Sequence, residues 1–320
     1  MRRLFTLPLC VIGGLALAQA QSVTLKPGKF KPPANVGLQK TLIESLRLRD
    51  PLAIRLPDHG VKWVVSKTGL SAKAAKALAM DVDLRPKIDK FALAVKDQGS
   101  RGTCSVFAMT FLLEYNYALW EDFSSRHLSE EYLNWAANAA TNNNDDGDWF
   151  SRLALGFKKY GIAQDTAAPY SSTFQPGWSP PTYARNDAVE RAGQQKFWVV
   201  FDDPEMGISQ DELDSVTKLL DASIPVAIGQ AWPDTKLDGK YKVENLMGID
   251  CLTDASGTLG GHSMVAVGYK RTSAFPGGGY FVFRNSWGSS SWDQGYWILS
   301  FSYVRKYAYD AYAAGWDGIK

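Results

Sequence analysis

Apolar side chains recur on one side of the segment that begins at Cys104. Counted from that residue, they fall at steps of three, four, seven, eight, eleven and fifteen. This is the spacing of one face of an α-helix. The pattern therefore predicts a long helix that starts at or near Cys104. The apolar positions are Phe107, Ala108, Phe111, Leu112, Tyr115 and Leu119.

Capping residues indicate three further helices. Each begins with a Ser or Asp whose side chain can accept a hydrogen bond from the first turn. The expected caps are Ser129, followed by Glu130 and Glu131; Asp148, ahead of a helix that runs to Tyr160 and stops at Gly161; and Ser209, which forms a capping box with Glu212.

Short apolar runs bounded by glycines and turn residues dominate the rest of the chain. They predict strands over residues 224–228, 262–269, 280–285 and 295–300. Helices thus come first and antiparallel strands follow. This order is typical of an α+β fold, in which a helical N-terminal lobe faces an antiparallel β lobe.

The chain opens with the pattern of a secretory signal peptide. Arg2 and Arg3 precede an apolar run over 4–17, and Ala18-Gln19-Ala20 is a small-residue cleavage site. We therefore expect residues 1–20 to be removed and the protein to be secreted or periplasmic. No second apolar run is long enough to span a membrane. Residues 21–79 are expected to form a pro-region or extension, and 80–320 the main domain.

The charge balance changes once the signal is removed. Lys and Arg number 35 against 33 Asp and Glu, and the signal takes two arginines and no acid. The remaining chain is formally neutral, which gives no electrostatic reason to expect nucleic acid or an anionic membrane as partner. We expect a monomer.

Cysteine and histidine are both scarce. Cys10 leaves with the signal, so only Cys104 and Cys251 remain, and a fold stapled by many disulfides is excluded. Their spacing offers no zinc site. Residues 142–148 resemble a calcium loop, but Leu153 stands where its final acid is needed, so we expect a solvated loop there. No metal or cofactor is expected.

The position of Cys104 favours a reactive thiol. A helix N-terminus stabilises negative charge, and the thiolate is the nucleophilic form of cysteine. A thiolate nucleophile needs a base and a group that orients the base. His262 begins a predicted strand after Gly260-Gly261, and Asn285 ends the next strand. Neighbouring antiparallel strands can bring these two side chains together, with Trp287 shielding their hydrogen bond.

Cys-His-Asn is an established nucleophilic arrangement, and the segments around it resemble the papain family of cysteine peptidases. The resemblance covers about residues 80–300 and implies a two-lobed papain-like fold with an active-site cleft between the lobes. The matching pieces are Gln98-Gly99 with Gly102-Thr103-Cys104, Gly261-His262 with Ala266-Val267-Gly268-Tyr269, and Asn285-Ser286-Trp287-Gly288 with Gly295-Tyr296.

The resemblance implies a role for each matched residue. Cys104 is the nucleophile, His262 is the base and later the general acid, and Asn285 orients the histidine. The side-chain amide of Gln98 and the N–H of Cys104 donate to the oxyanion. Substrate contacts are implied for Gly147, Asp148, Trp149, Gly261 and Trp287, although only Gly147 is retained from the family's glycine pair.

The chain also departs from the family pattern. Arg101 stands where the family has a cysteine, the partner cysteine is missing, and Ser105 replaces the aromatic residue that follows the nucleophile. The separation of 158 positions from Cys104 to His262 exceeds the roughly 130–150 expected and indicates inserted loops. These changes concern the packing behind Cys104 rather than its chemistry.

The prediction is a secreted cysteine peptidase that forms an acyl-enzyme, kept latent by residues 21–79. Two alternatives stay open at this stage. One is a catalytically silent, peptide-binding relative. The other is a cell-wall peptide hydrolase or transamidase that uses the same triad. Side-chain specificity, endo- or exopeptidase action, the propeptide boundary, the natural substrate and the role of Cys251 are not determined by the sequence.

Overall fold

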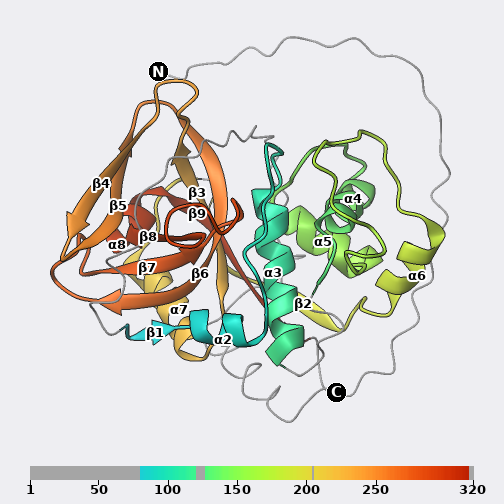
Figure 1. Ribbon diagram of the computed structural model, residues 1–320, viewed down its shortest axis with the longest axis horizontal. Coiled ribbons are helices and arrows are strands. Elements are labelled where there is room, and N and C mark those ends of the chain that lie inside the picture. The colour runs from blue at the N-terminus through green and yellow to red at the C-terminus, as the bar shows by residue number, and fades with distance from the viewer. Residues whose placement is uncertain (1–79, 120–126, 204, 317–320) are drawn as a thin grey trace.

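The computed structural model describes residues 80–119, 127–203 and 205–316. The expected signal peptide and pro-region, 1–79, lie outside the described residues. Within the described part, α4, α5 and α6 form one lobe, most strands together with α7 and α8 form the other, and the long helix α3, Cys104–Leu119, lies between them (Figure 1). This is the expected α+β arrangement. Every residue of α3 except the last is buried, because both lobes pack against it.

The helical lobe contains α4 (Glu130–Thr141), α5 (Phe150–Tyr160) and α6 (Thr182–Val189). The Ser129 hydroxyl accepts a hydrogen bond from the Tyr132 N–H (2.9 Å), as its capping role predicts. The expected cap at Asp148 is wrong by one residue, since Trp149 is the N-cap of α5. The Asp148 carboxylate accepts the N–H of its own neighbour Trp149 instead (2.8 Å).

The sheet lobe contains the four expected strands. They are β3 (Val226–Pro233), β6 (Leu259–Arg271), β7 (Gly279–Arg284) and β8 (Tyr296–Ser300). Helix α7, Gln210–Asp221, precedes β3 and begins with the predicted capping box of Ser209 and Glu212. The short β1 (Val82–Asp83) pairs with β6 and is followed by α2 (Arg85–Lys90).

Besides the short β1, the sequence did not predict four strands that complete the sheet. These are β2 (Gln195–Asp202), β4 (Lys240–Leu246), β5 (Ile249–Ser256) and β9 (Ala308–Trp316), the last following helix α8, Phe301–Tyr307. The strand order is β2-β9-β3-β6-β7-β8-β5-β4. Strands β4 and β5 form a hairpin whose two turn residues, Met247 and Gly248, both have positive φ, the geometry that matches strand twist.

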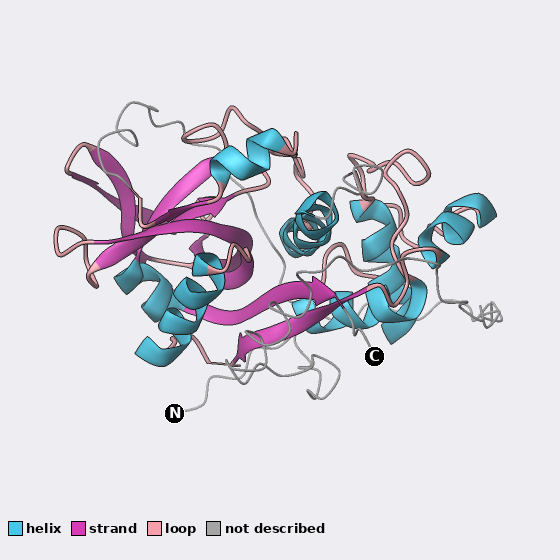
Figure 2. Cartoon of the chain, turned by 90° about the horizontal axis from the view of Figure 1, so that it is seen from below, coloured by secondary structure: helices cyan, strands magenta, loops and turns pink. Residues whose placement is uncertain are grey.

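Strands β2 and β9 carry the sheet beneath α3 to the helical lobe. Seen from below, the sheet continues under the central helix (Figure 2). Phe157 of α5 packs edge-on against Phe197 of β2 (5.5 Å), and Phe150 packs against Tyr312 of β9 (5.4 Å). One apolar core therefore spans both lobes and holds them in a fixed relation.

The pairing of β6 with its neighbours sets the position of the predicted base. His262 lies opposite Gln230 of β3, near the end of β6 where the strand faces α3. Gly261 lies opposite Ala231 in the same ladder. A register shift between Ala266 and Gly268 bends β6 against β7, as a bulge does.

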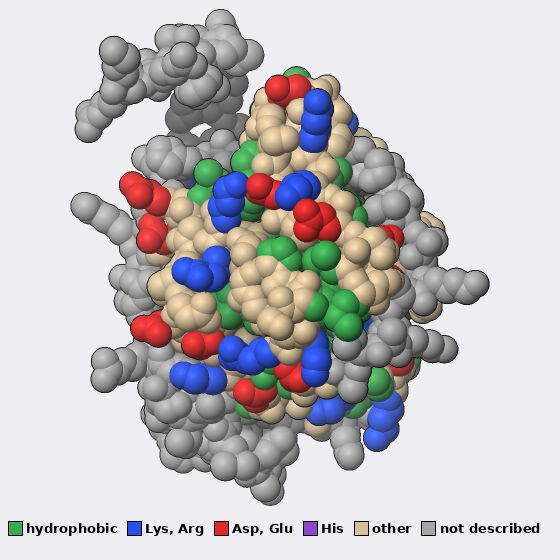
Figure 3. All heavy atoms as spheres, turned by 90° about the vertical axis from the view of Figure 1, so that its left-hand side faces the viewer, with side chains coloured by type: hydrophobic (Ala, Val, Ile, Leu, Met, Phe, Trp, Pro, Cys, Tyr) green, Lys and Arg blue, Asp and Glu red, His purple; other side chains and the backbone are tan. Residues whose placement is uncertain are grey.

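The surface and the helices of the described part add two observations. On the face of the sheet lobe seen in Figure 3, basic and acidic side chains are interspersed. Among the described residues, no helix combines the length and apolar character needed to cross a bilayer.

The packing of α4 on α5 gives a first testable prediction. A Cβ added to Gly156 would lie 2.4 Å from the Ala137 nitrogen, inside van der Waals contact. Gly156→Ala should therefore lower the free energy of unfolding by about 1–3 kcal/mol through overpacking, despite the better helix propensity of Ala. Urea unfolding monitored by circular dichroism measures the difference.

Gly260→Ala is the matched control for this substitution. The nearest atom to an added Cβ at Gly260 is the Trp232 carbonyl oxygen, at 4.0 Å, so this variant should unfold as the wild type does. A Gly156→Ala protein as stable as Gly260→Ala would contradict the close packing of the two helices.

Candidate active site

Cys104 is the first residue of α3, and its side chain is fully buried. The Phe107 N–H donates to the Thr103 carbonyl (3.0 Å), so the helical hydrogen-bond ladder starts just before the cysteine. The backbone and the hydroxyl of Ser263 on β6 lie close enough to the Cys104 sulfur to lower the pKa of the thiol. The thiol thus lies against the strand segment that carries His262.

His262 and Asn285 meet as predicted. The ring nitrogen Nε2 of His262 lies 2.8 Å from Oδ1 of Asn285. The Ser286 N–H also donates to that oxygen (2.8 Å), which identifies it as the carbonyl oxygen of the amide. Nε2 must therefore carry the proton, and Nδ1 keeps its lone pair as a proton acceptor.

Tryptophans surround the imidazole. The Trp287 ring stacks on His262 with centroids 4.5 Å apart and planes inclined by 23°. Trp232 of β3 approaches the same ring at 5.2 Å. Both indoles are almost fully buried, so the hydrogen bond between His262 and Asn285 is shielded from water. Exclusion of water strengthens such a bond and fixes the orientation of the ring.

Burial also governs the ionisation of the two reacting groups. Removal from water raises the pKa of the Cys104 thiol to about 12, against the opposing hydrogen bonds of Ser263 and Ser105. Burial lowers the pKa of His262 to about 4, against the stabilising hydrogen bond of Asn285. The expectation of a lowered thiol pKa is therefore wrong for the buried thiol, because desolvation outweighs the hydrogen bonds that favour the thiolate.

Gln98 lies beside the nucleophile in the segment that leads into α3. Its amide Nε2 donates to the Arg101 carbonyl (2.8 Å), and its Oε1 accepts from the Ser286 hydroxyl (2.6 Å). The side chain is fully buried and its amide plane is fixed from both ends. An amide nitrogen has two donors, so one N–H of Gln98 is left without a partner among the described residues.

The comparisons with known proteins agree with this geometry. A family model described as papain family cysteine protease matches residues 78–311. This chain belongs to the papain family. It is a cysteine-type peptidase, and its substrates are peptides or proteins.

Individual relatives extend the match. Cysteine proteinase 3 of Entamoeba histolytica is 27% identical over 246 residues, which cover 75% of this chain and 69% of that protein. Xylellain, a cysteine protease from Xylella fastidiosa, has the same fold with a TM-score of 0.55 at 20% identity, over 81% of this chain and 94% of xylellain. Bromelain from Ananas comosus matches with a TM-score of 0.50 at 21% identity, over 75% of this chain and all (100%) of bromelain. The predicted papain-like fold is confirmed.

Three of the five substrate contacts expected from the papain family, Gly147, Asp148 and Trp149, lie on the loop before α5, whereas Gly261 lies on β6 and Trp287 follows β7. Gly147 has a φ of 91° and packs so tightly that an added Cβ would lie 2.0 Å from the Gly102 carbonyl oxygen. Trp149 packs edge-on against Tyr309 of β9 with centroids 5.9 Å apart, so the two lobes touch here. Asp148 is buried and lies 3.4 Å from Arg152.

Several residues of this papain-family site were missed in the sequence. From the sequence, Ser263 was assigned only to an apolar strand, and Arg101 was noted only as a departure from the papain family pattern. Glu131 was read as a first-turn acid, although its side chain is buried. A signal for buried ion pairs was available in the sequence. It consists of two consecutive glutamates before an apolar helix face and of an arginine upstream that is flanked by glycines.

The buried carboxyl of Asp148 leads to a prediction on pH. Burial raises its pKa to about 6, above the roughly 3.9 of an exposed aspartate, against the opposing N–H of Trp149 and charge of Arg152. A raised carboxyl pKa stabilises the fold fully below about pH 3.9, and this contribution is lost as pH rises through about 6. Asp148→Asn keeps the shape without the titration. From about pH 4 to 7 it should therefore lose about 2–3 kcal/mol less stability than the wild type.

Urea unfolding at about pH 4, 5, 6 and 7 measures this difference. Asp211→Asn, at an exposed position in the first turn of α7, is the matched control and should follow the wild-type profile. Parallel pH profiles for wild type and Asp148→Asn would show that Asp148 does not titrate in this range.

Proposed function

We propose that this protein is a secreted or periplasmic peptidase that cleaves peptide bonds through Cys104, His262 and Asn285. In this proposal residues 1–20 are the signal peptide, 21–79 are a pro-region and 80–320 form the peptidase domain. The observation that supports this proposal most directly is the hydrogen bond between His262 Nε2 and Asn285 Oδ1 (2.8 Å). This bond leaves Nδ1 of His262 free to act as the base, and His262 lies on the same strand as Ser263, which contacts the Cys104 sulfur.

The proposed reaction begins with transfer of the Cys104 proton to Nδ1 of His262. The sulfur attacks the peptide carbonyl carbon, and the resulting oxyanion accepts hydrogen bonds from the Cys104 N–H and the Gln98 amide. His262 then gives its proton to the leaving amine, and a thioester remains on the enzyme. A water molecule, deprotonated by His262, attacks the thioester and releases the acid.

Asn285 holds the imidazole in the tautomer that this sequence of steps requires. Its carbonyl oxygen is itself held by the Ser286 N–H, so the orienting group is fixed by backbone. Trp287 covers the bond between the two side chains, and the imidazolium that forms has the amide dipole beside it. Gly261 and the Gly147–Trp149 loop are proposed to contact the substrate on either side of the sulfur.

We further propose that the full-length chain is latent. Cys104 has no exposed surface and its thiol pKa is raised, whereas attack on a substrate needs an accessible thiolate. In this proposal, removal of residues 21–79 restores solvent to the thiol and lowers its pKa. Procathepsin B S9 from Trypanosoma congolense is a proform with the same fold, at a TM-score of 0.55 and 12% identity over 87% of this chain and 89% of that one.

The nucleophile is tested by comparing the two free cysteines. Cys104→Ala should abolish release of dye from labelled casein, a loss on the order of 10⁶-fold for removal of a nucleophile. Cys251→Ala, which removes the other buried free thiol, should retain activity within about twofold. In the processed enzyme, a thiol-directed epoxide should label Cys104 faster than Cys251 at neutral pH.

Each alternative function has its own outcome in these assays. Equal, slow labelling of both cysteines in an inactive protein that has been processed to begin near residue 80 would indicate a silent peptide-binding relative. Fast labelling of Cys104 without hydrolysis of casein, but with release or exchange of cell-wall crosslinks, would indicate the hydrolase or transamidase alternative. Residual casein hydrolysis by Cys104→Ala would contradict the proposed nucleophile.

Latency is tested by N-terminal sequencing of the active, secreted protein. We expect an N-terminus near residue 80, and alkylation of Cys104 by iodoacetamide at neutral pH should be at least about tenfold faster after processing, because the exposed thiol ionises more easily. The catalytically inert Cys104→Ala chain, which cannot process itself, should keep the longer N-terminus if cleavage is autocatalytic. An active enzyme that begins at residue 21 would contradict latency.

A further inference from the structure

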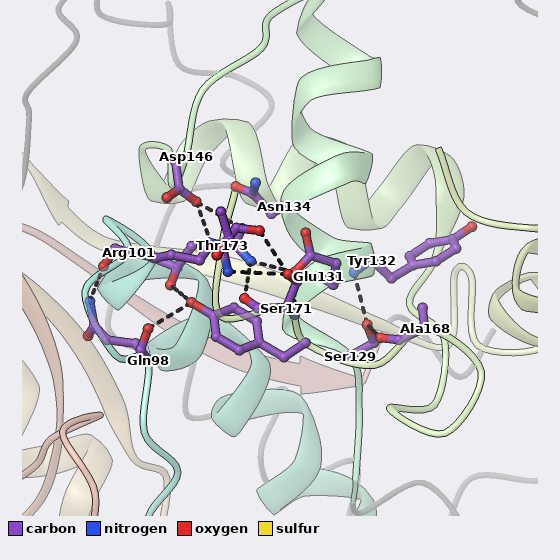
Figure 4. A network of polar contacts seen from close by, with 12 residues as sticks. Gln98, Arg101, Ser129, Glu131, Tyr132, Asn134, Asp146, Ala168, Ser171 and Thr173 are labelled. Carbon is purple, nitrogen blue, oxygen red and sulfur yellow. Dashed lines mark hydrogen bonds and ion pairs between the residues drawn. The ribbon is translucent and has the colours of Figure 1, made fainter. Parts of the chain in front are cut away.

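Arg101 is a buried arginine in the loop that leads to the nucleophile. Only 3% of its side chain is exposed, yet every nitrogen of the guanidinium has an acceptor. Nη1 lies 2.5 Å from Glu131 and donates to the Ser171 carbonyl (2.7 Å), while Nη2 and Nε donate to Asp146 (2.8 and 3.0 Å). Figure 4 shows these groups converging on the guanidinium from α4 and from two loops.

Aromatic rings and a tyrosine hydroxyl complete the surroundings of Arg101. The guanidinium carbon lies 4.5 Å from the centre of the Tyr170 ring, a cation–π distance. The Tyr170 hydroxyl donates to the Gln98 carbonyl (3.0 Å) and shares a hydrogen bond with the Thr103 hydroxyl (2.7 Å). The ring under the guanidinium therefore also holds the two ends of the loop from Gln98 to Thr103.

The backbone of Arg101 acts directly on Gln98. The Arg101 carbonyl accepts one of the two N–H bonds of the Gln98 amide (2.8 Å), which fixes the direction of the other. Any rotation of the loop at Arg101 would move this carbonyl and turn the amide with it. The fixed guanidinium prevents such a rotation, because planar, forked hydrogen bonds allow only one orientation.

The same ion pairs reach the loop that carries Gly147. Asp146 binds the guanidinium through Oδ1, and its Oδ2 accepts from the Gly102 N–H (3.4 Å). Gly147 then packs against the Gly102 carbonyl. The two loops on either side of the nucleophile are thus joined through one arginine, at the position where the family pattern has a cysteine.

We propose that Arg101 is a positioning residue for the oxyanion donor Gln98, and that its contacts with Glu131 and Asp146 replace a covalent link between the two loops. The proposal rests on the proposed function, in which Gln98 donates to the oxyanion. The loop from Gln98 to Thr103 is then held by ion pairs and hydrogen bonds alone, so a reducing agent does not change its position.

A double-mutant cycle on the processed enzyme tests whether Arg101 acts through Gln98. Gln98→Ala should lower kcat by about 10²–10³-fold, as loss of an oxyanion donor does. Arg101→Met should lower kcat by about 10–100-fold, because a small displacement of a catalytic group is costly. The double variant should be no slower than Gln98→Ala within about threefold, since residues that act through one group are not additive.

Two further measurements separate positioning from general damage to the fold. Alkylation of Cys104 by iodoacetamide needs the thiolate but no oxyanion donor, so Arg101→Met should label within about threefold of wild type. Arg101→Lys, which keeps the charge but not the fork, should recover part of kcat. Arg271→Met is the matched control, since Arg271 is half exposed and pairs with Asp214 away from the site, and it should match wild type.

Glu131→Gln keeps an acceptor oxygen but removes the charge, and it replaces Arg101→Met as the test variant if Arg101→Met does not fold. It should show a smaller loss of kcat that is again not additive with Gln98→Ala. Losses that multiply in the double variants, or a loss of labelling equal to the loss of kcat, would overturn the proposal for Arg101. A wild-type kcat in Gln98→Ala would instead contradict the oxyanion role in the proposed function.

Discussion

The active site depends on how the segment before Cys104 is seated on the first turn of α4. Two consecutive glutamates there hold two basic residues of that segment. The Lys96 ammonium lies 2.7 Å from Glu130, and the Arg101 guanidinium lies 2.5 Å from Glu131. Gln98 stands between the two anchored positions. The segment therefore has no freedom to slide, and the cysteine that follows it enters α3 at one place.

These anchors are stable only because they are paired. Lys96 is shared by Glu130 and Glu114, which lies at 2.8 Å, so two carboxylates compete for one ammonium. Burial and this second negative charge raise the pKa of Glu130 to about 7, although Lys96 opposes the shift. Removing one partner of such a buried pair is costly, about 3–5 kcal/mol, because the other charge is left without compensation. These buried ion pairs fix the position of the segment before Cys104 more than they add to the free energy of unfolding.

The opposite side of the same segment joins the two lobes. The Gln98 N–H donates to the Ser286 carbonyl (2.8 Å), and the Gly288 N–H donates to the Lys96 carbonyl (3.1 Å). Ser286 donates to Asn285 Oδ1 through its N–H and to Gln98 Oε1 through its hydroxyl, so it links the group that orients His262 to the group proposed to bind the oxyanion. A shift of one lobe against the other would break these backbone bonds before it could separate the nucleophile from its base.

The sequence by itself determined the local elements and the chemistry. The sequence predicted the helix at Cys104 and the caps at Ser129 and Ser209, because helical spacing and capping depend on short segments. It also predicted the pairing of His262 with Asn285, because histidine is scarce in this chain and few residues could serve as the base. Asp148 was predicted as the cap of α5, whose N-cap is in fact Trp149, and the strands β1, β2, β4, β5 and β9 were not predicted. β9 is rich in alanine and becomes a strand only by pairing with β2 and β3. The role of Arg101 and the direction of the Cys104 pKa also required the tertiary structure, because both depend on burial and on charges brought together from distant parts of the chain.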